Sequence, residues 1–317
     1  MFKNKKIGVL IPAYNEEKLI GAVLDNLPEY VDEVLVVDDG STDKTCSIAE
    51  RKNVSVIRHP HNRGVGAAFH TGVEKVLEMD IDILVTMDAD GQFNPLDIEK
   101  LIAPLLSGQA DFVSGSRFKD PDCFPKMPGI KFIGNKVMSL FISKLSGMKF
   151  YDVSCGFRAY SKKALLNLNL FGDFTYTQET FLDLSFKNIP IAEVPIKIEG
   201  VRKVGKSRVA SNLFNYAHRT FQIILKTLRD YRPLVLFGGI ASANFICGSI
   251  LGLFLLIHYL QTGRFGPHKW AGFVSGFFMV MAFLFLLIGF ILDMIARMRR
   301  NQEKIMYLLR KNLNKNE

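Results

Sequence analysis

The chain has 317 residues, carries a formal net charge of +9 and is 48% hydrophobic, with 26 phenylalanines. This length accommodates one large or two ordinary domains, and so apolar a composition argues against an enzyme that lies wholly in water. The positive charge favours phosphate-bearing ligands or anionic lipid heads; because no base-reading motif accompanies it, nucleic acid is not expected as a partner. Four scattered cysteines form no C-x-x-C pair, which argues against a zinc site and a disulfide framework.

Over about a hundred residues from the N-terminus, apolar runs alternate with helical patterns. Apolar, β-branched runs predict buried strands at residues 7–11, 33–39, 54–58, 83–87 and 111–114. Between these runs, the spacing of apolar residues predicts helices from Glu16 onward, from Thr42 or Asp43 to Arg51, over 64–79 and over 95–106. Strands that alternate with helices indicate an α/β domain built on a mostly parallel sheet.

Two carboxylates follow the strand expected at 83–87. If the backbone stays extended, Asp88 and Asp90 point to the same side, because successive side chains of a strand alternate. Paired carboxylates at the ligand-binding edge of a parallel sheet can hold one divalent cation. Mg²⁺ or Mn²⁺ suits carboxylate oxygens combined with a substrate phosphate. The alternative is a solvated Asp-Gly turn that only ends the strand.

Polar clusters also follow the first two strands. The first contains Pro12, Tyr14 and Glu16, and the second contains Asp38 and Asp39. Tyr14 can cover a base, whereas Glu16 and one carboxylate of the aspartate pair can accept hydrogen bonds from ribose hydroxyls or base N–H groups. A helix cap followed by a turn explains either cluster alone. Taken together, the clusters indicate a nucleotide site at one edge of the sheet.

Two later segments have the pattern of amphipathic helices with basic residues. In 130–145, apolar side chains gather near one face, with three lysines between them. In 213–231, apolar side chains alternate along the helix with arginines and a lysine. Each pattern fits either a core helix of a soluble domain or a helix that lies in a membrane interface. We expect an interfacial helix over 211–232; for 130–145 both alternatives stay open.

Two stretches near the C-terminus have the composition of membrane spans. Residues 234–260 contain no Asp, Glu, Lys or Arg, and residues 271–292 are likewise uncharged. Both exceed the roughly 20 residues with which a helix crosses the hydrocarbon core; a buried helical pair in a soluble protein is the alternative. Five arginines lie just before the first stretch or just after the second, whereas the link between the two stretches holds Arg264 and Lys269. By the positive-inside rule, we expect a multi-pass protein of the cell membrane, with a hairpin over 233–295, a basic cytoplasmic tail over 296–317 and the large domain in the cytoplasm.

The combined clusters resemble glycosyltransferase family 2, with its GT-A nucleotide-sugar-binding fold, over residues 1–210. The run from Asn62 to Ala68 is similar to the family's glycine-bearing helix start, where Arg63 and backbone N–H groups can approach a diphosphate. Further parts of the chain resemble the polyprenyl-phosphate branch of the family. They are Gly115-Ser116-Arg117, Lys131 with Asn135, Asp152 to Tyr160, and Arg202 to Arg208. Arg208 stands where this branch usually has lysine, which keeps the charge, and Lys131 stands where many members have arginine, so that position offers a point charge in place of a bidentate phosphate contact.

The resemblance implies metal-dependent, inverting transfer of a sugar from a GDP- or UDP-sugar to a polyprenyl phosphate, dolichyl or undecaprenyl, at the cytoplasmic membrane face. Catalytic roles are implied for Asp88, Asp90, Arg117 and Asp152. The implied ligands of Mg²⁺ or Mn²⁺ are Asp88, Asp90 and Gln92. Donor binding is implied for Pro12, Tyr14, Glu16, Asp38, Asp39, Arg63, Ala89, Gln92, Arg202 and Arg208. Contact with the acceptor phosphate is implied for Arg117, Lys131, Asn135 and Arg158.

Several alternatives stay open. Arg117 and Arg158 also fit structural ion pairs, and Gln178 and Glu179 fit either sugar recognition or helix capping. A processive polysaccharide synthase would carry a Gln-x-x-Arg-Trp motif, but the single tryptophan is Trp270 in the link. An inactive membrane scaffold that binds lipid phosphate is a further alternative, against which the intact Asp88, Asp90 and Arg117 argue. The base, the sugar, the lipid and a homo-oligomeric state are left undecided.

Overall fold

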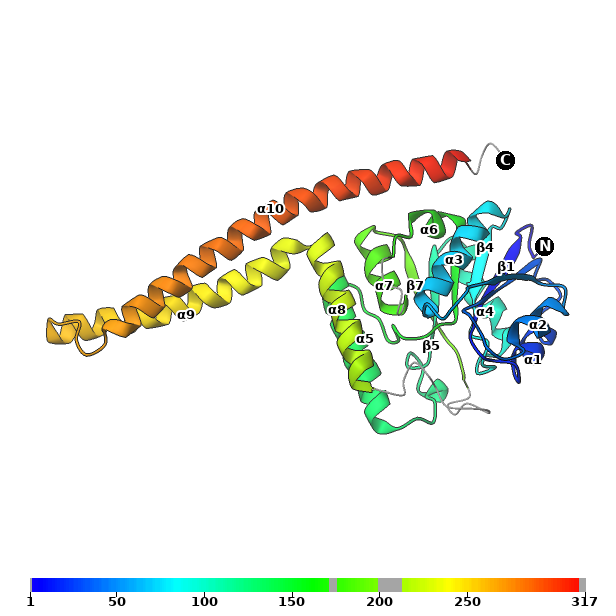
Figure 1. Ribbon diagram of the computed structural model, residues 1–317, viewed down its shortest axis with the longest axis horizontal. Helices are drawn as coiled ribbons and strands as arrows, with labels where there is room; N and C mark the ends of the chain where they lie inside the picture. The colour runs from blue at the N-terminus through cyan, green and yellow to red at the C-terminus, as the bar shows by residue number, and fades with distance from the viewer. Residues whose placement is uncertain (1, 171–175, 199–212, 314–317) are drawn as a thin grey trace. The chain divides into compact units, whose positions relative to one another are not determined.

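The computed structural model of the protein describes residues 2–170, 176–198 and 213–313 (Figure 1). Its contacts divide the chain into two units, one formed by Met1–Ile223 with Tyr307–Glu317 and the other by Ile224–Met306. Arg202 and Arg208, both expected at the donor, lie outside the described residues.

A seven-stranded sheet forms the centre of the first unit, in the order β3-β2-β1-β4-β6-β5-β7. Its strands are β1 (Ile7–Ala13), β2 (Glu33–Asp38), β3 (Ser55–Arg58), β4 (Ile83–Thr86), β5 (Phe112–Ser116), β6 (Arg158–Ser161) and β7 (Ile191–Pro195). All neighbouring strands pair in parallel except β6, which runs antiparallel to both β4 and β5. The prediction of a mostly parallel α/β sheet is confirmed, and the five expected strands form with nearly the expected ends.

Every residue of β1 and β4 is buried. Because successive side chains of a strand point to opposite faces, this burial shows that both faces of the sheet are covered. The apolar core includes Val9 and Ile11 of β1, Val85 of β4 and Phe157 just before β6. Continuous apolar runs are the pattern that such doubly covered strands require.

The expected helices form as α1 (Ile20–Asp25), α2 (Thr45–Glu50), α3 (Val65–Glu78) and α4 (Ile98–Leu106), the last preceded by a 3₁₀ turn at Pro95–Asp97. Helix α1 begins later than the expected Glu16. Asn15 has a φ of 51°, and the backbone N–H of Glu16 donates to Thr45 Oγ1 at 2.7 Å. Glu16 therefore lies in a turn, and the helix has its N-cap at Leu19.

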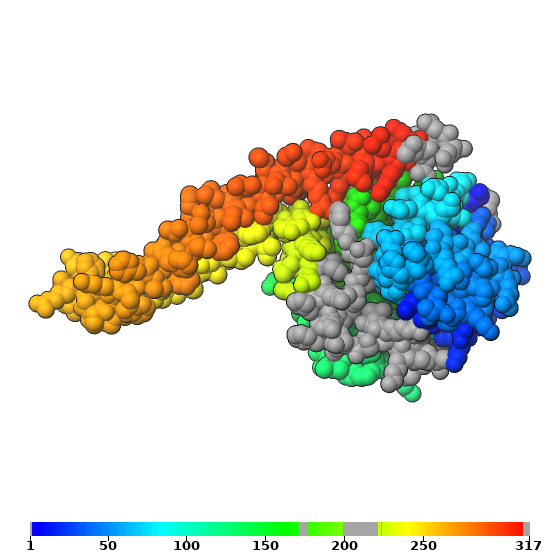
Figure 2. Space-filling view, viewed as in Figure 1, coloured from blue at the N-terminus to red at the C-terminus, as the bar shows by residue number. Residues whose placement is uncertain are grey.

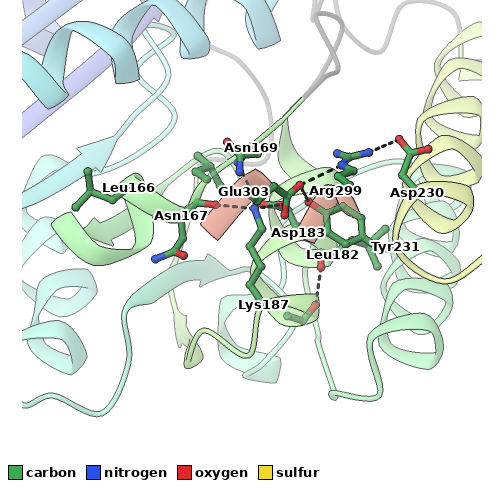
Figure 3. Close-up of polar contacts among 12 residues, drawn as sticks. Leu166, Asn167, Asn169, Leu182, Asp183, Lys187, Asp230, Tyr231, Arg299 and Glu303 are labelled. Atoms are coloured by element: carbon green, nitrogen blue, oxygen red, sulfur yellow. Dashed lines mark hydrogen bonds and ion pairs between the residues drawn. The ribbon is translucent and has the colours of Figure 1, made fainter. Parts of the chain in front are cut away.

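Four elements on the C-terminal side of the domain were not expected as such: β6, β7, α6 (Lys162–Asn167) and the full length of α7 (Thr177–Phe186). Strand β6 has the sequence Arg-Ala-Tyr-Ser, so its own apolar pattern is weak and its pairing on both sides holds it in place. Side chains also tie α6 to α7 (Figure 3): Lys187 Nζ lies 2.8 Å from Asp183 Oδ1 and donates to the carbonyl of Asn167 at 2.6 Å.

The two amphipathic segments form α5 (Gly129–Ser146) and α8 (Leu213–Tyr231). Helix α5 is followed by the C-cap residue Gly147, whose φ of 77° is left-handed and favours glycine. Along α5, four apolar side chains are strongly exposed: Ile130, Ile133, Val137 and Leu140, at 68%, 62%, 60% and 72%. This exposed stripe is not the face of an ordinary core helix.

The second unit contains α9 (Pro233–Thr262) and much of α10 (Lys269–Leu313), two helices long and apolar enough to cross a membrane. They run side by side as a rod, coloured yellow and orange in Figure 2. Ser275 Oγ donates to the Gly248 carbonyl at 2.7 Å, because glycine lets the two backbones approach closely. The expected tail continues α10 without a break, since residues 293–313 contain neither Gly nor Pro.

A polar cluster joins the end of α8 to α10 within the second unit (Figure 3). Arg299 Nη1 lies 2.6 Å from Asp230 Oδ2, and its Nε lies 3.1 Å from Glu303 Oε1. The hydroxyl of Tyr231 donates to the same glutamate oxygen at 2.8 Å. These contacts connect the C-terminal end of α8 to α10.

Candidate active site at the carboxyl edge of the sheet

Strand directions bring the predicted site residues to one edge of the sheet. Strands β1, β2, β4 and β5 run the same way, so Asp38 at the end of β2, Asp88 after β4 and Arg117 after β5 all lie at that edge. Strand β6 runs the opposite way and pairs Arg158 with Thr86. The segment before β6, residues 152–157, therefore arrives at the same edge.

The carboxylate of Asp88 lies against the backbone of Gly156. A Cβ built on Gly156 would stand 2.9 Å from Asp88 Oδ1 and 3.0 Å from Oδ2, so this close approach requires glycine. Thr86 Oγ1 donates to the carbonyl of Gly156 at 2.8 Å and fixes that peptide. Neither Gly156 nor Thr86 was expected at the site, although Gly156 falls inside the Asp152 to Tyr160 motif.

Tyr176 lies behind this carboxylate. Its ring stacks on Phe69 with centroids 4.0 Å apart, and its hydroxyl lies 3.5 Å from the Gly156 carbonyl oxygen. Burial, and after it the negative charge of Asp88, raises the pKa of Tyr176. The phenol therefore stays neutral and serves as a hydrogen-bond donor beside the carboxylate.

A turn follows Asp88 and exposes the second carboxylate. Asp88 and Asp90 are half-buried, whereas Ala89 between them is 3% exposed. Asp90 Oδ1 accepts the backbone N–H of Gln92 at 3.1 Å, and Gly91 between them has a φ of 68°. Among the residues that the structure describes, no group of three His, Cys, Asp or Glu side chains is placed to hold a metal. Two carboxylates and an amide fit a cation that takes its other oxygens from a phosphate ligand.

Arg117 is held by Asp152 through a bidentate ion pair. Arg117 Nε lies 2.6 Å from Asp152 Oδ2, and Nη2 lies 2.8 Å from Oδ1. Asp152 is fully buried, and its backbone N–H donates to Glu193 Oε1 at 2.8 Å. Burial acts to raise the pKa of Asp152, but the charge and hydrogen bonds of Arg117 outweigh it, and the pKa lies below its ordinary value. Asp152, expected to be catalytic, is therefore placed to orient Arg117.

Arg158, expected at the acceptor phosphate, is fully buried. Its Nε donates to the Cys155 carbonyl at 2.7 Å and its Nη2 to the Thr177 carbonyl at 2.9 Å. The guanidinium carbon lies 5.1 to 5.6 Å from the ring centroids of Phe181, Tyr176 and Phe112. A guanidinium enclosed in this way does not meet a lipid phosphate, so the geometry corrects the expectation in favour of the structural alternative.

Asp39, expected at the donor, has both carboxylate oxygens engaged within the protein. Oδ1 accepts the backbone N–H of Arg63 at 2.9 Å, and Oδ2 accepts that of Gly64 at 2.8 Å. These two N–H groups are thus bonded to Asp39 instead of pointing to a diphosphate, which corrects part of the expectation for this loop. The Arg63 side chain is exposed.

The remaining donor residues gather around β1 and β2. Pro12 is buried in β1, where it pairs with Val37. Tyr14 and Glu16 are half-buried in the turn that follows. Asp38 is fully buried, and its Oδ1 accepts the Ser41 backbone N–H at 3.1 Å.

Lys131 and Asn135 are one helical turn apart on α5 and both are half-buried. Gln178 and Glu179 are buried at the start of α7. Gln178 Nε2 donates to Ser154 Oγ at 3.3 Å, so this side chain supports the segment that carries Asp152.

The strand order, the antiparallel β6 and the carboxylates at the strand ends define a glycosyltransferase of the GT-A class. The sequence profile described as Glycosyl transferase family 2 matches residues 8–168. The chain belongs to this family, which confirms the predicted enzyme class.

Known relatives share this domain. The chain is 40% identical over 215 residues to the UDP-N-acetylglucosamine–dolichyl-phosphate N-acetylglucosaminyltransferase of Methanococcus voltae, covering 61% of this chain and 86% of the relative. It is 30% identical over 223 residues to the undecaprenyl-phosphate mannosyltransferase of Micrococcus luteus, covering 67% and 90%. A glucosyl-3-phosphoglycerate synthase from Mycobacterium tuberculosis, solved with Mn²⁺, UDP-glucose and phosphoglyceric acid, shares the fold with a TM-score of 0.57 at 22% identity, over 71% of this chain and 80% of that one.

Proposed function

We propose that the protein transfers a sugar from a nucleoside-diphosphate sugar to a polyprenyl phosphate at the cytoplasmic face of a membrane. The observation that carries this proposal is the oriented Arg117 at the same sheet edge as Asp88 and Asp90. One side of the site thus offers positive charge to an anionic acceptor, and the other offers carboxylates to a metal. The relatives whose names include dolichyl phosphate and undecaprenyl phosphate support a lipid-phosphate acceptor.

Asp88, Asp90 and Gln92 would hold Mg²⁺ or Mn²⁺ on the donor. When bound, the ion neutralises charge on the departing nucleoside diphosphate. The solved synthase that contains Mn²⁺ and UDP-glucose supports a divalent ion. Gly156 and Thr86 hold Asp88 in position for this role, because they set the peptide against which its carboxylate rests.

The acceptor oxygen needs little help from a base. A phosphate monoester has its second pKa near about 6, so it is mostly a dianion at neutral pH. Its oxygen forms the bond to the anomeric carbon while the bond to the donor's diphosphate oxygen breaks, and the nucleoside diphosphate leaves with that electron pair. No proton has to be removed, and a single displacement inverts the anomeric carbon.

The protein must therefore hold two anions close together. Arg117, oriented by Asp152, is placed to contact the acceptor phosphate, and Lys131 and Asn135 of α5 are proposed to extend that contact. Arg202 and Arg208 are proposed to serve the donor phosphates. Charge-assisted contacts of this kind strengthen where water is excluded.

For the donor, we propose that Tyr14 covers the base and that Glu16 accepts hydrogen bonds from the nucleoside, while the fully buried Asp38 supports the site through its contact with the Ser41 backbone. Pro12 and Ala89 are proposed to line the same site through their backbone, and Arg63 to approach the diphosphate. The name of the Methanococcus relative includes a UDP-sugar, which favours UDP over GDP.

The catalytic domain is proposed to end near residue 210. The proposed order beyond it is an interfacial helix over 211–232, a hairpin over 233–295 and a cytoplasmic tail. The exposed apolar side chains of α9 and α10 support this membrane placement. A hairpin with both ends on one side keeps the catalytic domain on the side of the arginine-rich flanks.

The test uses the purified full-length protein with a short-chain polyprenyl phosphate and labelled UDP- or GDP-sugars. We expect a lipid-linked sugar with Mg²⁺ or Mn²⁺ and none after chelation. Asp88→Asn and Asp90→Asn should each lower turnover at least a hundredfold, equivalent to roughly 3 kcal/mol of transition-state stabilisation, with little change in Tm. Glu78→Gln, an exposed carboxylate on α3, is the control. Turnover near wild type in either aspartate variant would contradict the metal assignment.

A further inference from the structure

A buried histidine lies beneath the loop that carries Arg63, and it belongs to none of the sequence motifs. His59 is 4% exposed. Its backbone N–H donates to the Asp38 carbonyl at 2.8 Å, which extends the pairing of β2 with β3. Its ring lies between two side chains, with Nδ1 2.8 Å from Asp39 Oδ1 and Nε2 2.9 Å from Thr71 Oγ1.

The direction of these hydrogen bonds follows from the partners. An ionised carboxylate only accepts hydrogen bonds, so His59 Nδ1 carries its hydrogen and donates a hydrogen bond to Asp39 Oδ1. In the neutral ring, Nε2 then accepts from the Thr71 hydroxyl. The histidine is thus held at both nitrogens, one by the carboxylate after β2 and the other by α3.

Asp39 in turn holds the loop that carries Arg63 and Gly64. The same carboxylate accepts the N–H groups of Arg63 and Gly64, at 2.9 and 2.8 Å, and is 3% exposed. The loop is also pressed against Gly40, where a Cβ would stand 2.5 Å from the His61 carbonyl carbon. The φ of 73° at Gly40 likewise favours glycine.

We propose that His59 is a positioning residue for the donor sugar nucleotide. It fixes the Asp39 carboxylate, which holds the Arg63–Gly64 backbone and so directs the Arg63 side chain toward the donor diphosphate. The inference rests on the proposed function, and it assigns Asp39 to support of this loop in place of direct contact with the nucleoside. His59 itself touches no substrate.

Two substitutions separate the two ring contacts. The amide nitrogen of asparagine is one bond from Cγ, as Nδ1 is in histidine, whereas that of glutamine is two bonds away, as Nε2 is. His59→Asn therefore keeps the donor to Asp39, and His59→Gln keeps the partner of Thr71. Because His59→Gln loses the hydrogen bond to Asp39, it should raise the donor KM about tenfold, as expected for loss of a hydrogen bond to a charged group, with little change in kcat. His59→Asn stays near wild type.

A double-mutant cycle shows whether the effect passes through Arg63. Arg63→Ala alone should raise the donor KM about tenfold. Adding His59→Gln to it should then change the donor KM by less than about twofold, because residues that act through one another are not additive. Two independent effects that multiply would overturn the proposal.

Amide hydrogen exchange supplies a readout that does not depend on activity. In the full-length protein, His59→Gln should speed exchange over residues 60–66, because the Arg63 and Gly64 N–H groups lose a fixed acceptor. His59→Asn should not, and neither should His61→Ala, which removes an exposed histidine of the same loop. Equal exchange in the Asn and Gln variants would show that His59 only fills space, and would overturn the proposal.

The outcomes also separate this inference from the proposed function. If no donor is turned over by the wild type but exchange follows the expected pattern, the proposed function fails and support of the loop by His59 stands. If His59→Gln does not fold, Asp39→Asn tests the same link, because its amide presents a donor to one of the two N–H groups. Unchanged exchange in that variant would overturn the proposal.

Discussion

Asp152 is fully buried and engages Arg117 with both carboxylate oxygens. Arg158, six residues further along the chain, is buried among aromatic rings and bonded to carbonyl oxygens. The two arginines therefore differ in what they can reach. Only Arg117 is partly exposed, with its side chain 14% accessible, and this difference decides which guanidinium can meet a phosphate.

Replacing Asp152 with asparagine should weaken both stability and transfer. Removing one partner of a buried ion pair leaves the other charge poorly compensated, so Asp152→Asn should cost roughly 3 kcal/mol. Arg117 also loses its orientation, so transfer to the lipid phosphate should fall about tenfold or more while affinity for nucleoside diphosphate is retained. Thermal unfolding, nucleotide binding and turnover measure the three effects, and Glu78→Gln in an exposed ion pair is the control.

The cost of Asp152→Asn should depend on pH in one direction. Because the folded pKa of Asp152 lies below its ordinary value, its contribution is complete above the unfolded pKa of about 3.9 and is lost as the pH falls through the folded pKa. The Tm difference between wild type and variant should thus be full at neutral pH and shrink in acid. A difference that grows on acidification would show that Arg117 does not stabilise the charged carboxylate.

At the scale of elements, the direction of β6 assembles the site. Because β6 is antiparallel to β4, the segment that precedes it reaches the carboxyl edge and places Gly156 against Asp88. A parallel strand in this position would bring its leading segment to the opposite edge. The same segment carries Asp152, so one strand direction sets the surroundings of both Asp88 and Arg117.

Helix α5 supplies a testable membrane contact. Its exposed stripe, which includes Ile133 and Leu140, is apolar and interspersed with lysines, as in helices that lie in a membrane interface. The double variant Ile133→Ser, Leu140→Ser should lower turnover of long-chain polyprenyl phosphate in proteoliposomes about tenfold, without lowering Tm. Its turnover of a short-chain acceptor in detergent should stay close to that of wild type.

Leu96→Ser is the matched control for α5, because Leu96 is 68% exposed on a different element. It should leave turnover unchanged in both settings. A marked fall in Tm for the α5 double variant would instead mean that the stripe packs against protein. In that case the interfacial assignment of α5 is wrong.

At the scale of the whole molecule, the chain combines a catalytic unit with an apolar helical pair. Helix α10 is continuous from Lys269 to Leu313, so the second apolar stretch and the basic tail form one element. The charged cluster of Asp230, Arg299 and Glu303 lies beyond the apolar rod. Its charges are costly in hydrocarbon, which favours an aqueous or headgroup setting for this end of the helices.

The membrane topology predicts the accessibility of introduced cysteines. In a variant whose native cysteines are replaced, a membrane-impermeant reagent should label a cysteine near Arg264 in intact cells. It should not label cysteines near Lys3 or Lys315 until the cells are opened. The reason is that more basic residues lie before the first span and after the second than in the link between the two spans. Labelling of the ends alone would reverse the orientation.

Much of the framework follows from local sequence. Apolar runs and their spacing were enough to locate β1 to β5, α3, α4 and the two apolar spans, because burial on one or both faces leaves a periodic pattern in the chain. The carboxylates Asp88 and Asp90 were identified in the same way, since their position after a strand is itself a local feature. The family profile matches residues 8–168, the stretch that contains these strands and carboxylates.

Only the tertiary structure decided which polar side chains are exposed and which are internal supports. Arg158, Asp39 and Asp152 look like ligand-binding residues in the sequence, yet their partners lie up to tens of positions away along the chain, as with Asp152 and Arg117. His59 belongs to no sequence motif, and its proposed role depends on two side-chain contacts, with Asp39 and with Thr71. Such roles depend on long-range packing, because the free energy of a buried charge is set by the partners that surround it, and no short stretch of sequence contains those partners.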